Sequence, residues 1–516
     1  MLAGLGVAGS VAANDAPLSA IDWLKNPAPI HLSDPLQVAL PAQPGMKGAE
    51  DREAEDKGAR VPQIEVTPLT QQRADAAGLL SPETTGLPAT LWQESATETL
   101  VALLRRLPAD PLPSLQSLYY TLLLAEADPP GDARGDPSFL RARLDALRRL
   151  GAVDPALALA NQAGERDAAV FDAWFDLSLL TGTEDGACTA LVASPDLTQR
   201  YDSRIFCLAR SGDWSTAALV LQSAKAIGAI TPRKATMLEA FLDPDLVGLS
   251  PEMAPSTAAM TPLLFRLHEA VGAPLPTTSL PREYAMADLR GFSGWKAEIE
   301  AAERLTHSGA LPANRLLGLY TDRSPAASGG VWDRAEGVQA LERALTRGES
   351  AAVSDILPPL WRAMRREGLA TAFAAMFAED LSQLELEPEA QRVAFHMALL
   401  STDYRRLAPI LAASSPEDGF LASLAQGRPD PNLARSPGEQ AVVAGFAATG
   451  ASPDHADLLE AGRVGQAILL AALQLDRATP NALRDIEAGL ATLRALGLED
   501  TARRTALEIL LLRKDA

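Results

Sequence analysis

The chain has 516 residues, of which 47% are hydrophobic and only 5% aromatic, and its formal net charge is −20 at pH 7. A surface of that sign repels phosphate backbones, so the composition excludes nucleic acid as an expected partner. The sequence also lacks a run of the ~18–20 apolar residues that a membrane span requires, and we expect no span.

Residues 1–13 carry no charge and are rich in Leu, Ala, Gly and Val. Val11, Ala12 and Ala13 form the small-residue pattern of a signal-peptidase site, with cleavage before Asn14, although a basic n-region is missing. We interpret residues 1–13 as a signal-peptide remnant. This interpretation predicts a periplasmic or secreted protein, and the alternative is a cytoplasmic protein with an apolar tail.

Residues 14–92 are predicted to form a long extended or disordered N-terminal arm. Prolines interrupt the first part of this range, and residues 47–60 are a mixed-charge run without apolar periodicity. Residues 61–66 alternate apolar and polar side chains, which is the pattern of a short strand. The range therefore reads as a Pro-rich and charged linker.

From about residue 93 the sequence predicts short helices joined by short loops. The helix starts share a capping Ser, Thr or Asp followed by Pro, and many ends carry Gly. The starts are Asp136-Pro137, Asp154-Pro155, Ser194-Pro195, Thr231-Pro232, Thr261-Pro262, Ser415-Pro416, Ser436-Pro437, Ser452-Pro453 and Thr479-Pro480. Breaks near residues 243–281 and 322–330 suggest an N-terminal helical-repeat region, 93–325, and a C-terminal one, 326–516.

Residues 198–242 contain the clearest helical pattern in the chain. We expect helices at 202–210 and 214–227, a turn between them, an αL glycine at Gly228, and a third helix starting at Pro232. The second helix is predicted to bury one apolar face, which consists of Trp214, Ala217, Ala218, Leu221, Ala224 and Ile227.

A glycine, a polar residue and then an Ala-bearing helix recur at Gly212, Gly348 and Gly462. This pattern resembles the turn between the paired helices of tetratricopeptide-like (TPR-like) repeats, over about a third of the chain. The resemblance implies an all-α fold of antiparallel helical hairpins, stacked as an irregular α-solenoid. The chain is also similar in style to uncharacterised exported helical proteins of Rhodobacter-type bacteria, and that resemblance implies no activity.

The two cysteines, Cys188 and Cys207, lie on consecutive predicted helices, nearly equidistant from the loop that joins them. An antiparallel hairpin brings them to the same level, so we predict a disulfide. In a reducing compartment they would instead be two small buried side chains.

Catalytic signatures are missing from the sequence, and we assign no catalytic, cofactor-binding or metal-ligating residue. The five histidines are scattered singly, without a metal-ligand spacing. The basic clusters at 141–149 and 362–366 are interpreted as solvated helix faces. The tryptophans of the helical region are expected to fill gaps between helices.

The sequence therefore predicts a non-catalytic helical-repeat scaffold that binds another protein or a peptide, without a cofactor. Two alternatives remain. One is a helical accessory domain for cell-wall glycan, because the chain resembles the superhelical parts of soluble lytic transglycosylases. The other is an α/α-toroid enzyme acting on polysaccharide.

Overall fold

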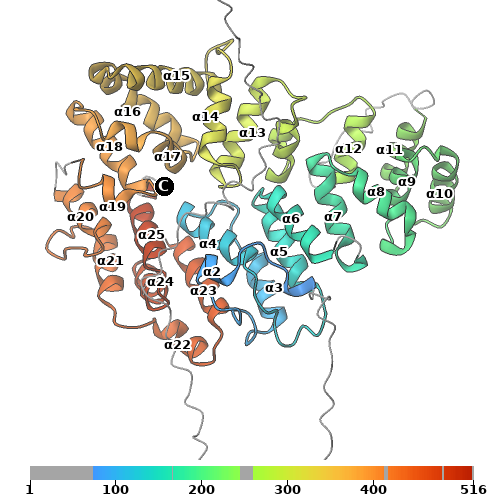
Figure 1. Cartoon of the computed structure of the whole chain (residues 1–516), viewed down its shortest axis with the longest axis horizontal. Helices are drawn as coiled ribbons and strands as arrows, with labels where there is room; N and C mark the ends of the chain where they lie inside the picture. Colours follow the sequence, from blue (N-terminus) through green and yellow to red (C-terminus); the bar gives the residue numbers. More distant parts are fainter. Residues whose placement is uncertain (1–73, 165–166, 244–259, 412–415, 479–481, 514–516) are drawn as a thin grey trace, which may run out of the picture.

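The computed structural model describes residues 74–164, 167–243, 260–411, 416–478 and 482–513 (Figure 1). The predicted signal-peptide remnant and the strand-like residues 61–66 lie outside these ranges. Within them every regular element is a helix, and a single isolated bridge pairs Leu80 with Ala125. The all-α prediction is therefore confirmed for the described residues.

The first helices pack at the lower centre of Figure 1. They are η1 (Ala74–Ala76), α2 (Pro82–Thr85), α3 (Thr97–Arg105), α4 (Pro113–Leu124), α5 (Ser138–Arg149), α6 (Val153–Gly164) and α7 (Ala168–Thr181). The next helices project to one side. They are α8 (Asp185–Ala193), η2 (Pro195–Leu197), α9 (Tyr201–Arg210), α10 (Trp214–Ala226), α11 (Pro232–Leu242) and α12 (Pro262–Ala270).

The remaining helices return across the top and down the other side of the molecule. The first of them are η5 (Thr277–Ser279), η6 (Arg282–Arg290), α13 (Trp295–His307), α14 (Ala313–Thr321), α15 (Val331–Arg347), α16 (Ser350–Arg366), α17 (Ala370–Leu381) and α18 (Pro388–Leu400). The last are α19 (Tyr404–Leu407), α20 (Pro416–Ala425), α21 (Pro437–Ala447), α22 (Pro453–Glu460), α23 (Val464–Arg477), α24 (Leu483–Ala495) and α25 (Glu499–Leu512).

The helices stack on one another, and their packing runs in a closed circuit. Starting from α4, each helix contacts the next in the order α5, η6, α13, α14, α17, α18 and α25, and α25 packs against α4 again. We call this circuit the ring. Within this circuit the N-terminal and C-terminal helical regions predicted from the sequence therefore meet twice, once where α14 contacts α17 and once where α25 contacts α4.

The side lobe consists of α8 to α12 and packs on α7. Helix α8 contacts α7 and α9, whereas α12 contacts α7 and α11, so the lobe begins and ends on the same ring-side helix. Figure 1 shows α10 at the outer end of the lobe.

The predicted turns are confirmed where the sequence placed them. Gly212 joins α9 to α10, Gly348 joins α15 to α16 and Gly462 joins α22 to α23. Each has a positive φ, of 88°, 66° and 70° respectively. Glycine reaches this conformation without the Cβ clash that other residues meet, which is why it occupies the turn.

The contact of α4 with α23 and α25, which we call the seam, is formed around two buried carboxylates. The backbone and hydroxyl of Ser114 donate to Glu508 Oε2 at 2.9 and 2.6 Å. The backbone N–H of Leu112 donates to Asp476 Oδ1 at 2.9 Å, and Tyr119 donates its hydroxyl to the same carboxylate at 3.3 Å. Carboxylates at a helix N-terminus accept hydrogen bonds from its free N–H groups and interact favourably with the positive end of its dipole.

Helix α4 has no local side-chain cap, because Leu112 occupies its N-cap position. Helix α3 is similar: its N-cap is Ala96, and the Asp132 side chain accepts from the Thr97 backbone at 3.0 Å. The acidic loop around Asp132 therefore caps a helix. Neither long-range cap follows the Ser/Thr/Asp-Pro pattern, so the sequence did not reveal them.

The predicted extended arm, residues 14–92, includes residues at its C-terminal end that belong to the folded core. Leu80, Leu91 and Trp92 are buried in the main core, and residues 74–92 pack against the helices. Gly465 makes the last contact close, since a Cβ there would lie 2.5 Å from the Trp92 ring. The prolines and glycines of this stretch exclude a long helix, but they do not prevent its leucines and tryptophan from being buried.

The basic cluster at 141–149 is not a uniformly solvated face. Arg143 is fully buried, and its guanidinium donates to the carbonyls of Leu123, Ala77 and Ala125 at 2.8, 2.8 and 3.0 Å. Burial lowers its pKa to about 10. Arg143 therefore fastens the end of α4 and the loop before α2 to α5, using a charge that the sequence pattern assigned to solvent.

The tryptophan prediction holds in part. Trp174, Trp295 and Trp361 are buried among helices, whereas Trp214 is 49% exposed.

Candidate functional site

A cavity of about 370 Å³ opens between α5 and α7. Because residues three, four and seven apart share one face of a helix, Arg141, Asp145 and Arg148 line one wall. Asp172 and Asp176, four residues apart on α7, line the other wall. We call this cavity the α5/α7 groove. The rest of the lining, which we call the floor, is apolar and is formed by Leu144, Ala168, Ala169, Ala173 and Leu177.

The charged residues of the groove belong to a longer network in which the signs alternate. Arg148 lies 3.0 Å from Asp145 and 3.6 Å from Glu283 of η6. On the other wall, Arg200 donates to Asp176 at 2.8 Å. The network therefore holds both walls and leaves the groove nearly balanced in charge.

The same network continues into the side lobe. Arg200 lies 3.7 Å from Asp202 of α9, and Lys234 of α11 donates to Asp202 at 2.5 Å. Burial raises the pKa of Asp176 above its ordinary value, and the Arg200 guanidinium counteracts that shift. These pairs fix the orientation of α7 relative to α9 and α11.

Two side chains at the rim of the groove keep bonding capacity. Asp172 accepts a hydrogen bond from Thr198 at 2.6 Å on Oδ1, and Arg141 donates from Nε to the Ala169 carbonyl at 2.7 Å. Among the described residues, Asp172 Oδ2 and the two terminal nitrogens of Arg141 have no hydrogen-bond partner. The groove thus presents an acceptor on one wall and donors on the other.

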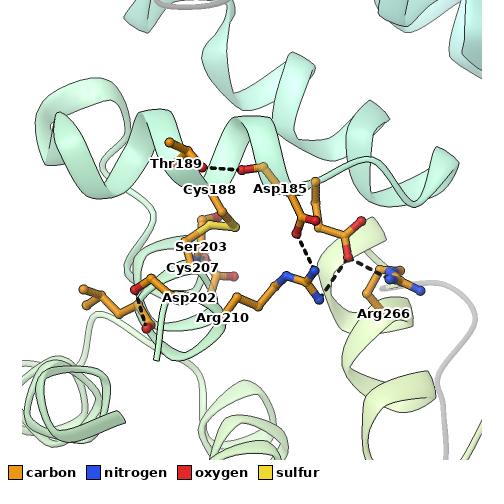
Figure 2. Close-up of a disulfide and its surroundings, with 11 residues drawn as sticks. Asp185, Cys188, Thr189, Asp202, Ser203, Cys207, Arg210 and Arg266 are labelled. Carbon is orange, nitrogen blue, oxygen red and sulfur yellow. Dashed lines mark hydrogen bonds and ion pairs between the residues drawn. A yellow bond between two sulfur atoms is a disulfide. The ribbon is translucent and has the colours of Figure 1, made fainter. Parts of the chain in front are cut away.

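The one pair of site residues predicted from the sequence comes together. Figure 2 shows Cys188 on α8 and Cys207 on α9, with Sγ atoms 2.05 Å apart, the distance of a disulfide. Both side chains are buried. Helices α8 and α9 are consecutive and pack on each other, as the hairpin interpretation required.

Ion pairs surround the disulfide and link the lobe to its neighbours (Figure 2). The buried Glu184 carboxylate accepts from Arg266 of α12 at 2.7 Å and lies 3.5 Å from Arg210 of α9. Arg210 also pairs with Asp185 at the start of α8. The covalent link therefore lies in the hydrophobic core beside a polar cluster that joins α8, α9 and α12.

The sequence did not identify the α5/α7 groove. Arg141 and Arg148 were recognised as basic residues, but nothing in the spacing connected them with Asp172 and Asp176, which both lie on α7 further along the chain. The described residues contain neither a cluster of three potential metal ligands nor a helix long and apolar enough to cross a membrane.

No protein-family model, curated protein or solved structure matches this chain.

Proposed function

We propose that this protein is a non-catalytic scaffold of the irregular TPR-like solenoid type, and that it binds an extended peptide segment of another protein in the α5/α7 groove. The observation that supports this proposal is the pairing of a free acceptor, Asp172, with free donors on Arg141 across an apolar floor. An extended peptide offers backbone N–H and C=O groups along its length, and these groups suit such a pair of walls.

Small residues at the floor support a peptide as the ligand. Ala169 and Ala173 leave room for a main chain between the helices, while Leu144 and Leu177 provide contact for apolar side chains. The described lining includes no aromatic ring. The glycan-binding alternative relies on aromatic-lined pockets, so this groove favours a peptide.

The test selects ligands from a random peptide library with the oxidised full-length protein and measures their affinity by fluorescence polarisation. The double variant R141Q/D172N removes donors and acceptor at the rim. It should weaken binding by about tenfold or more, because each lost hydrogen bond to a charged group contributes about 1.5 kcal/mol or more.

A matched control is R484Q/D454N, which removes the exposed ion pair between α22 and α24 (2.8 Å) at the same cost in formal charge. It should leave peptide affinity unchanged. The proposal fails if no peptide is enriched, or if both double variants weaken binding equally.

We also propose that the protein works in an oxidising compartment, the bacterial periplasm. Support comes from the Cys188–Cys207 pair, since such bonds persist where thiols are not kept reduced, and from the predicted signal-peptide remnant. Thiol counting and N-terminal sequencing of the native protein test this point. A mature terminus at or near Asn14 with no free thiol is expected, whereas an intact Met1 with two free thiols would return the protein to the cytoplasm.

A further inference from the structure

A second cavity, of about 350 Å³, opens on another face of α5, where this helix meets the loop before α4, the start of η6 and α13. Its lining contains three arginines, Arg149 of α5, Arg282 of η6 and Arg304 of α13, and a single acid, Glu283. The other seven lining residues are apolar. We call this cavity the arginine pocket. It concentrates positive charge in a chain whose net charge is −20.

Three of the four charged residues in the pocket have an ion-pair partner outside it. Asp145 also lies 3.0 Å from Arg148, so on this side of the pocket two acids balance two arginines. These charges are therefore compensated within the protein. The pairs are Arg149 with Asp145 at 3.3 Å, Arg282 with Asp110, and Glu283 with Arg148 at 3.6 Å.

Arg304 differs from the other charged residues of the pocket. Its two terminal nitrogens donate to the carbonyls of Thr277 and Leu280, each at 2.8 Å, and among the described residues no carboxylate forms an ion pair with it. Burial lowers the pKa of Arg304 and the nearby Arg282 lowers it further, whereas Asp288 opposes the shift. Asp288 itself accepts from the Thr277 hydroxyl. The pocket therefore contains one positive charge without a counterion.

A comparison with Arg143 shows what is particular to Arg304. Arg143 also donates to carbonyls, but three of them accept from its guanidinium, whereas two accept from Arg304. A guanidinium carries five N–H groups, so three remain on Arg304, which lines a cavity. A cation in a partly apolar environment is stabilised by an anion beside it. The cavity therefore has room for the counterion that the protein does not supply.

The apolar part of the pocket limits which anion fits. Leu107, Leu150 and Leu280 are buried and line the cavity, so a ligand must bring an apolar group to contact them. Inorganic phosphate has no such group, and its second charge would meet the Glu283 carboxylate in the same lining. The volume lies near the lower end of the ~300–1,000 Å³ typical of ligand pockets, so the ligand is small.

We propose that the arginine pocket binds a small organic acid, with its carboxylate on Arg304 and its apolar group against Leu107, Leu150 and Leu280. A planar guanidinium matches a carboxylate through parallel N–H···O hydrogen bonds. The carboxylate of a free acid and that of a peptide C-terminus share this chemistry. The inference does not rest on peptide binding in the α5/α7 groove, because the two cavities use different residues of α5.

Isothermal titration calorimetry of the oxidised full-length protein at pH 7 tests the proposal. The probe is 3-phenylpropionate, whose carboxyl group is ionised at this pH. Titration to ~10 mM covers the millimolar affinity of a ligand of this size. The acid should bind about tenfold or more tightly than 3-phenylpropionamide, which has the same ring without the charge. Acetate, which lacks the ring, should also bind more weakly.

Two variants locate the site. R304Q removes the uncompensated charge and should weaken binding by about tenfold or more. R315Q is its matched control, because Arg315 is an exposed residue of α14 and its loss changes the net charge equally, so binding should match the wild type. A109F fills the cavity from an exposed loop position without removing a charge, and it should weaken binding as strongly. A109F decides the test if R304Q does not fold.

Several results would overturn the proposal. They are equal affinity for the acid and the amide, tighter binding of phenyl phosphate than of the acid, unchanged binding in A109F or in folded R304Q, and no binding up to ~10 mM. A short peptide ending in phenylalanine distinguishes the two sources: affinity at least equal to that of the acid supports a protein C-terminus, and lower affinity supports a free acid. R141Q/D172N should bind the acid like the wild type, so this proposal and the proposed function can fail separately.

Discussion

The seam and the side lobe hold their helices in opposite ways. At the seam, Glu508 and Asp476 are buried and accept hydrogen bonds from the start of α4. In the lobe, most charges stay near the surface, α10 is largely exposed, and one disulfide joins α8 to α9. The seam therefore depends on buried carboxylates that accept from one helix end, whereas the lobe adds a covalent link to the ion pairs of Glu184 and Asp202.

This difference predicts how far a loss of stability should extend beyond the substituted residue. If a buried carboxylate of the seam is removed, the N–H and O–H groups that donated to it lose their partner inside the core. Both helices of that contact should then be destabilised together. A lost disulfide releases chain entropy only within its own loop.

The largest effect is expected for Glu508→Ala. The substitution removes the acceptor for the Ser114 backbone and hydroxyl and leaves a cavity between α25 and α4, so the free energy of unfolding should fall by about 4 kcal/mol. Glu508→Gln keeps one oxygen as an acceptor, so the free energy of unfolding should fall by about half as much. Urea denaturation followed by circular dichroism measures both.

Glu487→Ala provides the control, because Glu487 is an exposed residue of the neighbouring helix α24. It should change stability by less than about 0.5 kcal/mol. Equal effects of the substitutions at 487 and 508 would show that the seam does not depend on the buried carboxylate.

The second effect is expected for C188A/C207A. The bond closes a sequence separation of 19 residues, which corresponds to about 3 kcal/mol in the chain-entropy description. Hydrogen exchange should accelerate in α8 to α10, while the amides of α4 and α25 keep their protection. Faster exchange at the seam as well would mean that lobe and ring unfold as one unit.

The smallest effect is a pH dependence of stability that arises from His307, the last residue of α13 in the ring. Its Nε2 lies 3.3 Å from Asp110 Oδ1, and its Nδ1 lies 3.1 Å from the Glu367 carbonyl. The hydrogen bond with Asp110 raises the pKa of His307 above 6.5, although burial and the nearby Arg282 oppose the shift. The same contact holds the pKa of Asp110 well below its usual range.

A raised histidine pKa means that the folded state binds the proton more tightly. The contribution is fully present below pH 6.5 and is lost as the pH rises through the raised pKa. It should amount to less than about 1 kcal/mol, because both side chains are partly exposed. Urea midpoints at pH 6 and 8.5 should differ in the wild type and differ less in H307Q.

His455 offers a comparison of opposite sign. Burial lowers its pKa, so its contribution is present above pH 6.5 and declines as the pH falls. H455Q should therefore leave unchanged the fall in the free energy of unfolding that His307 causes between pH 7 and 8.5. If H455Q removed that loss, His307 would not be its source.

The sequence by itself determined the local features of this protein. The helices α9, α10 and α11, the glycine turns at Gly212, Gly348 and Gly462, and the approach of Cys188 to Cys207 all depend on interactions within about 20 residues. Spacing and capping residues record such interactions directly, so they could be predicted.

Only the tertiary structure decided which helices close the ring, which faces stay exposed and where the groove lies. Ser114 receives its cap from Glu508, 394 residues away, and Asp172 lines the same groove as Arg141 only because α6 brings α7 back beside α5. Trp214, Ala218 and Ile227 of α10 fit the apolar spacing of a buried face, yet they are exposed because, among the described residues, no helix packs beyond α10. Helical periodicity indicates that a face can be buried, but packing over the whole chain determines which partner buries it.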